Sequence, residues 1–119
     1  MSCSISGVYN ISCDQGATFS RVITWTDSAR SPYNITGYTA RMHVRSNVTA
    51  NTTAITLTTE NSRITLGGAA GTVTLTIAAT DTANLTAGLY VYDLELVSSA
   101  NVVTRLIEGN FNVKAEVTR

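Results

Sequence analysis

The sequence predicts an all-β fold, an antiparallel β-sandwich of seven or eight short strands. Apolar and polar residues alternate with period two through most of the 119-residue chain, and strand-favouring threonine and β-branched residues are abundant. Turn signals recur about every 8–12 residues, as they do in sandwich domains. Only one short corner, near residues 80–87, reads as helical. The length suits a single hydrophobic core.

The first strong strand is expected over residues 18–26, with Trp25 at the centre of the core. A turn follows over residues 27–37, and Gly37 closes it because glycine accepts φ > 0. The next strand, residues 38–45, alternates cleanly. Its inward residues are Tyr38, Ala40, Met42 and Val44, and its outward residues are Thr39, Arg41, His43 and Arg45.

The remaining elements follow from the same alternation. In chain order they are a polar loop (46–53), a short strand (54–59), two strands joined by a Gly-rich tight turn (62–78), a helical turn (79–88), the strongest strand (85–98) and a last strand (102–117). The short connection 98–101 predicts that the last two strands pair as a hairpin.

The helical turn and the strand after it specify the kind of sandwich. The segment 79–88 closes at Gly88 and leads into a strand that begins with Tyr90 and Tyr92. In immunoglobulin-like folds a corner of this kind precedes a strand whose early tyrosine returns a hydroxyl to the backbone upstream. We therefore expect an immunoglobulin-like sandwich, with either tyrosine in that role.

Composition excludes several classes of function. The net charge is zero and only 13% of residues are charged, against an average of about 25%. Binding to nucleic acid or to an anionic membrane requires clustered basic residues, and the eight here are scattered. Neither partner is expected. A low charge instead favours a surface that is covered in an assembly.

The chemistry-bearing residues predict no metal site and no cofactor. Cys3 and Cys13 are ten residues apart, and His43 is the single histidine, so no zinc-binding arrangement exists. The N-terminus lacks the basic and apolar regions of a signal peptide, which indicates synthesis in a reducing cytoplasm. Free thiols are then expected, although oxidation outside the cell would allow a bridge.

Asp93 and Glu95 are the best candidates for paired catalytic carboxylates, because side chains two apart on a strand share a face at about 6.5 Å. However, they alternate with the aromatic register, so both are expected on the solvent side, opposite the basic residues of strand 38–45. His43 lacks a nucleophile-elbow partner, and residues 66–71 (LGGAAG) match no phosphate-binding loop. We expect no catalytic residue and no enzyme.

Three motifs carry a family resemblance. They are a Pro-x-Asn-Ile-Thr-Gly turn (Pro32, Asn34, Ile35, Thr36, Gly37), a corner from Thr82 to Asp93, and a Gly-x-Phe-x-Val last strand (Gly109, Phe111, Val113). From about Tyr9 to Arg119 the chain resembles small virion proteins of tailed bacteriophages. It is also similar to the N-terminal immunoglobulin-like domain of phage upper baseplate proteins. Those proteins continue into a coiled coil or fibre domain, whereas this chain stops.

The resemblance implies a non-catalytic structural protein of the virion, assembled in the host cytoplasm. It would be a homo-oligomer that binds other virion proteins as a tail, baseplate or fibre-adaptor subunit. A capsid cement or decoration protein is the alternative. A second alternative is a module that binds host carbohydrate, with Tyr33 as the possible loop contact. Residues 1–8 are expected to form an arm that becomes ordered in the assembly, and residues 9–119 the sandwich.

Overall fold

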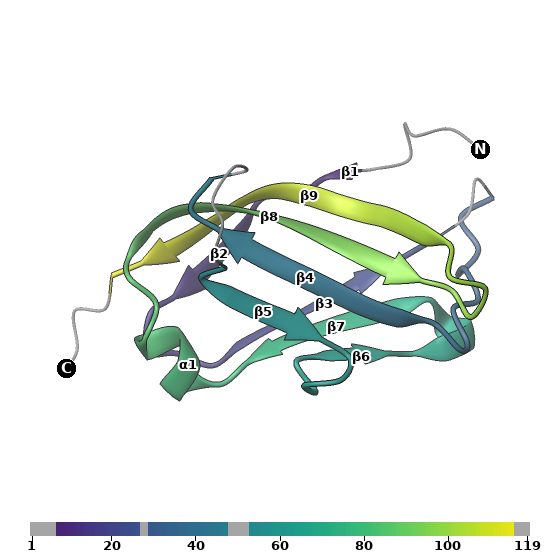
Figure 1. Ribbon diagram of the computed structural model, residues 1–119, viewed down its shortest axis with the longest axis horizontal. Helices are drawn as coiled ribbons and strands as arrows, with labels where there is room; N and C mark the ends of the chain where they lie inside the picture. The colour runs from purple at the N-terminus through teal and green to yellow at the C-terminus, as the bar shows by residue number, and fades with distance from the viewer. Residues whose placement is uncertain (1–6, 27–28, 48–52, 116–119) are drawn as a thin grey trace.

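In the computed structural model, two β-sheets pack face to face (Figure 1). The structure describes residues 7–26, 29–47 and 53–115. The larger sheet contains β1 (Gly7–Val8), β2 (Ile11–Asp14), β4 (Thr39–Arg45), β5 (Ile55–Thr58), β8 (Gly88–Val97) and β9 (Val103–Lys114). The smaller sheet contains β3 (Phe19–Thr24), β6 (Ile64–Leu66) and β7 (Thr72–Ile77). A 3₁₀ turn, η2 (Gly68–Ala70), precedes β7, and the short helix α1 (Ala79–Ala83) follows it.

The strand order is that of an immunoglobulin-like sandwich. The larger sheet runs β1-β9-β8-β4-β5, with β2 also on β9, and the smaller sheet runs β3-β7-β6. This matches the division of immunoglobulin-like strands into a GFC sheet that is extended by C′ and a BED sheet. The predicted hairpin of the last two strands is confirmed by the antiparallel β8–β9 ladder.

Tyr90 makes the predicted tyrosine corner. Its hydroxyl donates a 2.7 Å hydrogen bond to the carbonyl oxygen of Thr86, just before β8 begins. Tyr92, the other candidate, is buried in the core, where its ring makes an edge-to-face contact with Phe111. Gly88 opens β8, whereas the helical turn predicted to reach it ends five residues earlier, at Ala83. Just beyond the helix end, Leu85 is buried.

We expect that Tyr90→Phe lowers the free energy of unfolding by about 0.5–1.5 kcal/mol, the usual contribution of one hydrogen bond. The value should fall toward the lower limit, because the bond lies at the exposed surface and water can replace the lost donor. Urea unfolding measures the change. Thr24→Val, which removes an outward-facing hydroxyl from β3, is the control and should change the stability less. Equal effects of the two variants would contradict a stabilising corner.

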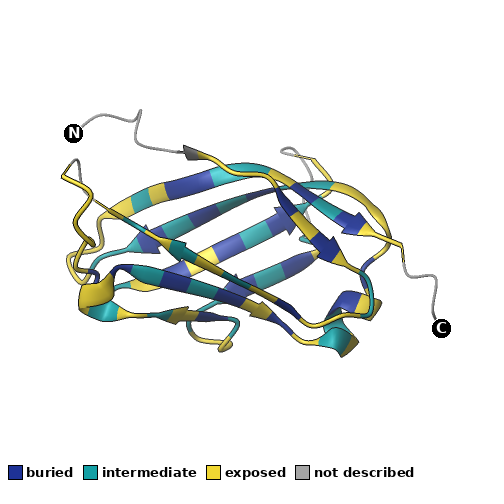
Figure 2. Cartoon of the chain, turned by 180° about the vertical axis from the view of Figure 1, so that it is seen from behind, coloured by how far each residue is buried: buried dark blue, intermediate teal, exposed yellow. Residues whose placement is uncertain are grey.

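The core lies between the two sheets, and the predicted inward registers are confirmed for Ala40, Met42 and Val44. Figure 2 shows the alternation of buried and exposed residues along the strands. The fully buried centre consists of Met42, Val44, Leu57, Val73, Leu75, Ile77, Leu94, Leu96 and Phe111. Trp25 is not among them, which corrects its expected place. β3 ends at Thr24, so Trp25 leaves the sheet and is half-buried at the end of the sandwich.

The N-terminal strands β1 and β2 were not predicted, and both run parallel to β9. Gly7 and Val8, assigned to the arm, pair with Ile107 and Glu108, so the sheet begins two residues before the expected boundary. The first six residues of the expected arm, Cys3 included, lie outside the described residues. Ile11 and Cys13 are buried, so this segment contributes to the core.

Gly109 allows this N-terminal segment to cross β9 closely. A side chain at Gly109 would place its Cβ 2.5 Å from the carbonyl oxygen of Tyr9. That same oxygen accepts a hydrogen bond from the hydroxyl of Tyr92. A glycine inside a strand marks this kind of close approach between backbones.

Candidate functional site

Charged side chains gather on the outer face of β4, β8 and β9. Nε of Arg41 on β4 lies 2.8 Å from Oε1 of Glu95 on β8. His43 and Asp93 are paired in the same ladder, two residues further along each strand and on the same face. The predicted placement of both carboxylates on the outer face, opposite the basic residues of β4, is therefore confirmed. It follows from β8 alternation, which buries Tyr92, Leu94 and Leu96 and turns the acids outward.

Strand β9 completes this face with two residues that the sequence did not single out. Nε of Arg105 lies 3.5 Å from Asp93 Oδ2, and its Nη1 lies 3.6 Å from Glu108 Oε1. The strands enclose an open groove of about 400 Å³. We call this surface the charged face. Its groove is lined by His43, Arg45, Val91, Tyr92, Asp93, Glu95, Arg105 and Glu108.

A β-bulge explains why Arg105 and Glu108 were missed. The ladder shifts between Leu94 and Glu95, so both Leu106 and Ile107 point inward. Arg105 and Glu108 lie on the two sides of this bulge. Strict alternation would assign them to opposite faces of the sheet, whereas the bulge brings them to the same face. Two consecutive apolar residues within an alternating strand were the available signal for it.

Ion pairs line the groove. Asp93 lies beside the guanidinium group of Arg105, and Glu95 lies beside that of Arg41. Nδ1 of His43 lies 3.3 Å from Nη2 of Arg45, whose guanidinium can only donate, so this ring nitrogen accepts. The face can recognise a polar, charged partner.

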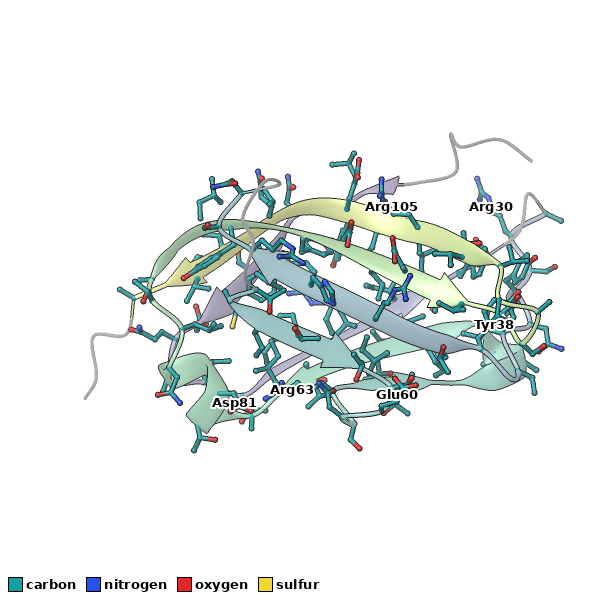
Figure 3. All side chains as sticks on the ribbon, viewed as in Figure 1. Arg30, Tyr38, Glu60, Arg63, Asp81 and Arg105 are labelled. Atoms are coloured by element: carbon teal, nitrogen blue, oxygen red, sulfur yellow. The ribbon has the colours of Figure 1, made fainter. Side chains whose placement is uncertain are left out.

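An aromatic cluster forms at one end of the sandwich, around Tyr33. The Tyr33 ring stacks on Trp25 with centroids 4.1 Å apart and planes 7° apart, and Trp25 also meets Tyr38 edge-on at 6.4 Å. Tyr38 lies at the loop end of β4 (Figure 3). Its hydroxyl pKa is raised above the ordinary value by burial, by electrostatic interaction with Tyr33 and by a hydrogen bond with Tyr33. Tyr33 itself remains 39% exposed.

The loop around Tyr33 is fixed by the motif residues on either side of it. Asn34 Oδ1 accepts bonds from the backbone N–H and the hydroxyl of Thr36, and Gly37 adopts φ +83°, as predicted for the turn. The backbone N–H of Tyr33 donates to the carbonyl oxygen of Trp25 at 2.8 Å. The cluster is therefore a fixed part of the fold, with one outward tyrosine.

The Gly-rich stretch and the possible metal ligands were the remaining candidates. The Gly-rich stretch 66–71 forms the turn between β6 and β7 through η2, as predicted. Residues 7–26, 29–47 and 53–115 contain no group of three or more metal-ligating side chains. None of the helices found there is long and apolar enough to cross a membrane.

Cys13 is a buried free thiol in β2. Burial, and to a smaller extent the charge of the neighbouring Asp14, raise the pKa of the Cys13 thiol from 9.0 to about 11. Since only the thiolate is nucleophilic, we expect no reaction with a disulfide reagent at pH 8 until the chain unfolds. The Cys3→Ser variant isolates the signal. Rapid labelling of the folded variant would contradict the burial of Cys13.

The same shift predicts how stability depends on pH. The folded pKa lies above the unfolded value, so the native state retains its proton while the unfolded state loses it. The contribution of Cys13 to stability is therefore complete below about pH 9 and falls as the pH rises toward 11. Denaturant titrations of the Cys13→Ala variant should show a weaker decline over this interval than those of the parent.

The sequence matches no protein-family model, and no curated protein matches it. Among solved structures it is similar to Tim-1, at 18% sequence identity and a TM-score of 0.44. The match covers 96% of this chain and 98% of that chain. Both the identity and the TM-score are low. The immunoglobulin-like fold is instead identified by the strand order of the two sheets and by the tyrosine corner.

Proposed function

We propose that this chain is a non-catalytic structural protein of a tailed-bacteriophage particle, and that it binds other virion proteins and copies of itself through its sheet faces. Within the particle, a tail, baseplate or fibre-adaptor position fits best with the resemblance of its motifs to phage baseplate domains. The observation that carries the proposal is the outer face of β3, β7 and β6, which is flat and uncharged.

We call this second surface the hydroxyl face. It consists of Ser20, Val22, Thr24, Thr65, Thr72, Thr74 and Thr76. The cross-strand pairs Ser20–Thr76 and Thr24–Thr72 place hydroxyls directly opposite one another. Another protein can cover this face without removing a charge from water, provided that the hydroxyl groups find hydrogen-bond partners. Val22, in the middle of β3 and at one edge of this face, is 58% exposed.

The charged face gives the sandwich a second, chemically different contact surface. Three guanidinium groups (Arg41, Arg45, Arg105) and three carboxylates (Asp93, Glu95, Glu108) alternate across it. Such a pattern gives specificity and orientation rather than affinity. Two different faces on opposite sides of one domain suit an adaptor that lies between two neighbours.

Cryo-electron microscopy of a purified particle tests the proposal. Density for this sandwich in a ring between tail and fibres would support the tail or adaptor position. Density on the capsid lattice would assign the chain to the cement class and overturn that position. Absence from the particle would overturn the structural role itself.

A carbohydrate-binding module is the second candidate, because the aromatic residues Trp25, Tyr33 and Tyr38 gather at one loop end. The observation against it is that Trp25 and Tyr33 stack on each other, which leaves only one face of Tyr33 for a sugar. A glycan array, followed by calorimetry, tests it. If sugars bind, Tyr33→Ala should abolish the signal. Tyr9 is a similarly exposed tyrosine elsewhere on the surface, so the Tyr9→Ala variant is the control and should still bind. An array without signal would overturn this candidate.

A further inference from the structure

Strand β3 is an outer strand of the smaller sheet. The sheet order is β3-β7-β6, so β3 pairs with β7 along one side only, within the described residues. The N–H of Trp25, just after the strand, donates to the carbonyl oxygen of Gly71. This bond shows which residues of β3 direct their backbone groups toward β7. By alternation, the N–H and C=O groups of Ser20, Val22 and Thr24 point away from β7. They form a row of hydrogen-bonding groups at the edge of the sheet.

The β5 edge, on the opposite side of the molecule, is treated differently. There the carbonyl oxygen of Thr56 accepts bonds from Nδ2 of Asn61 and Nη1 of Arg63. The N–H of Thr58 donates to Oδ1 of Asn61. Arg63 is held in place by Asp81 at 3.0 Å, and both are labelled near α1 in Figure 3. Side chains therefore cap the outward groups of β5.

In the described part of the chain, no side chain caps the outward groups of β3 in this way. Exposed strand edges are usually protected by charged residues, proline or bulges, because an open edge is a template for another strand. β3 contains no proline, and its register with β7 is unbroken over all six residues. Its one charged residue, Arg21, donates to the Tyr9 hydroxyl at 2.6 Å and does not bond the outward backbone groups of β3.

We propose that the edge of β3 pairs with β3 of a second copy of this chain, antiparallel, about a two-fold axis through Val22. The strand sequence suits this pairing. Val22 would lie opposite its own equivalent, and Ser20 opposite Thr24 of the second copy. The pairing covers Val22, which is now 58% exposed, and satisfies the outward backbone groups of all three residues.

Charge favours the same register. The outward residues of β3 are uncharged, so no like charges meet directly across the new ladder. Arg21 would lie opposite Ile23, while its guanidinium stays over the rings of Tyr9 and Phe19 in its own subunit. The result is one continuous six-stranded sheet with an uncharged outer face. The two hydroxyl faces would then form a single surface.

A three-residue edge contact is much smaller than a stable interface, which uses about 20–30 residues on each side. We therefore expect a weak dimer that forms where copies are concentrated, as in a multi-copy assembly. This inference does not depend on the virion role, because it concerns the isolated chain.

Cysteine cross-linking tests the register, in a Cys3→Ser background where the remaining Cys13 is buried. In an antiparallel hydrogen-bonded pair the Cα atoms are about 5.5 Å apart, within disulfide range. Val22→Cys should therefore give a covalent dimer when a concentrated sample is oxidised. Thr24→Cys should not, because its equivalents would lie about 13 Å apart along the strands. Val102→Cys, with a similarly exposed parent residue at 60%, controls for random collision.

Dimers of Val22→Cys in clear excess over both controls are the expected result. Equal dimer yields from all three variants, or none from Val22→Cys, would overturn the β3 pairing, and dimers from Thr24→Cys alone would overturn its register. Sedimentation of concentrated samples provides a second measurement without cysteines. Val22→Lys should reduce self-association and Val102→Lys should not. Equal behaviour of the two lysine variants would also overturn the pairing.

Discussion

Replacing Phe111 by alanine is expected to lower the free energy of unfolding by about 3–5 kcal/mol, the cost of a large cavity in a packed core. Phe111 lies on β9 and is fully buried. Its ring meets Phe19 of the opposite sheet at 5.9 Å and Tyr92 of β8 at 6.3 Å, both edge-to-face. The side chain therefore joins the two sheets at a position where neighbouring strands cannot easily close the gap.

Because small domains are stable by only about 5–15 kcal/mol, this one change should remove about a fifth or more of the total. Urea or thermal unfolding followed by circular dichroism measures it. Leu89→Ala, which truncates a residue that is 64% exposed, is the matched surface control and should change stability little. A similar small loss in both variants would show that Phe111 does not connect the sheets as described.

The sequence predicted the fold most accurately where alternation is strict. The strand predicted at residues 38–45 is observed as Thr39–Arg45, and the outward residues of β4 and β8 are those expected. Period two is a direct consequence of the pleat, so it needs no knowledge of neighbouring strands. The tyrosine corner was predicted for a similar reason, because its hydrogen bond spans only four residues.

The features that alternation could not predict depend on contacts between distant segments. β1 was assigned to the arm and β2 was not predicted as a strand, since their pattern is weak and their pairing partners lie about one hundred residues away on β9. Trp25 was placed in the core by its register. It lies instead just beyond Thr24, at the end of the β3–β7 ladder, where its N–H donates to the carbonyl oxygen of Gly71. Only part of the charged face was predicted, because its β4 and β8 residues alternate, whereas its β9 residues, Arg105 and Glu108, lie on the two sides of a bulge.

Gly71→Ala should be the most damaging single-methyl change at the loop end, with a loss of roughly 2–4 kcal/mol in unfolding free energy. Gly71 adopts φ +67°, which costs an alanine roughly 1–2 kcal/mol. In addition, the new Cβ would lie 2.7 Å from the carbonyl oxygen of Trp25 and 2.8 Å from that of Tyr33. These are backbone atoms, so they cannot rotate away, and the two segments that carry the aromatic cluster would have to separate.

Gly37→Ala provides the comparison that isolates this contact, because Gly37 has φ +83° but nothing within 4 Å of its Cβ position. It should therefore lose only the conformational cost of roughly 1–2 kcal/mol. The difference between the two variants in urea unfolding measures the close approach of the strand ends to Gly71. Only Gly71→Ala should also change the tryptophan fluorescence of the folded protein, since Trp25 is the single tryptophan and stacks on Tyr33. Identical losses and unchanged fluorescence would mean that the loop end tolerates separation, and that Tyr33 is not held in a fixed position there.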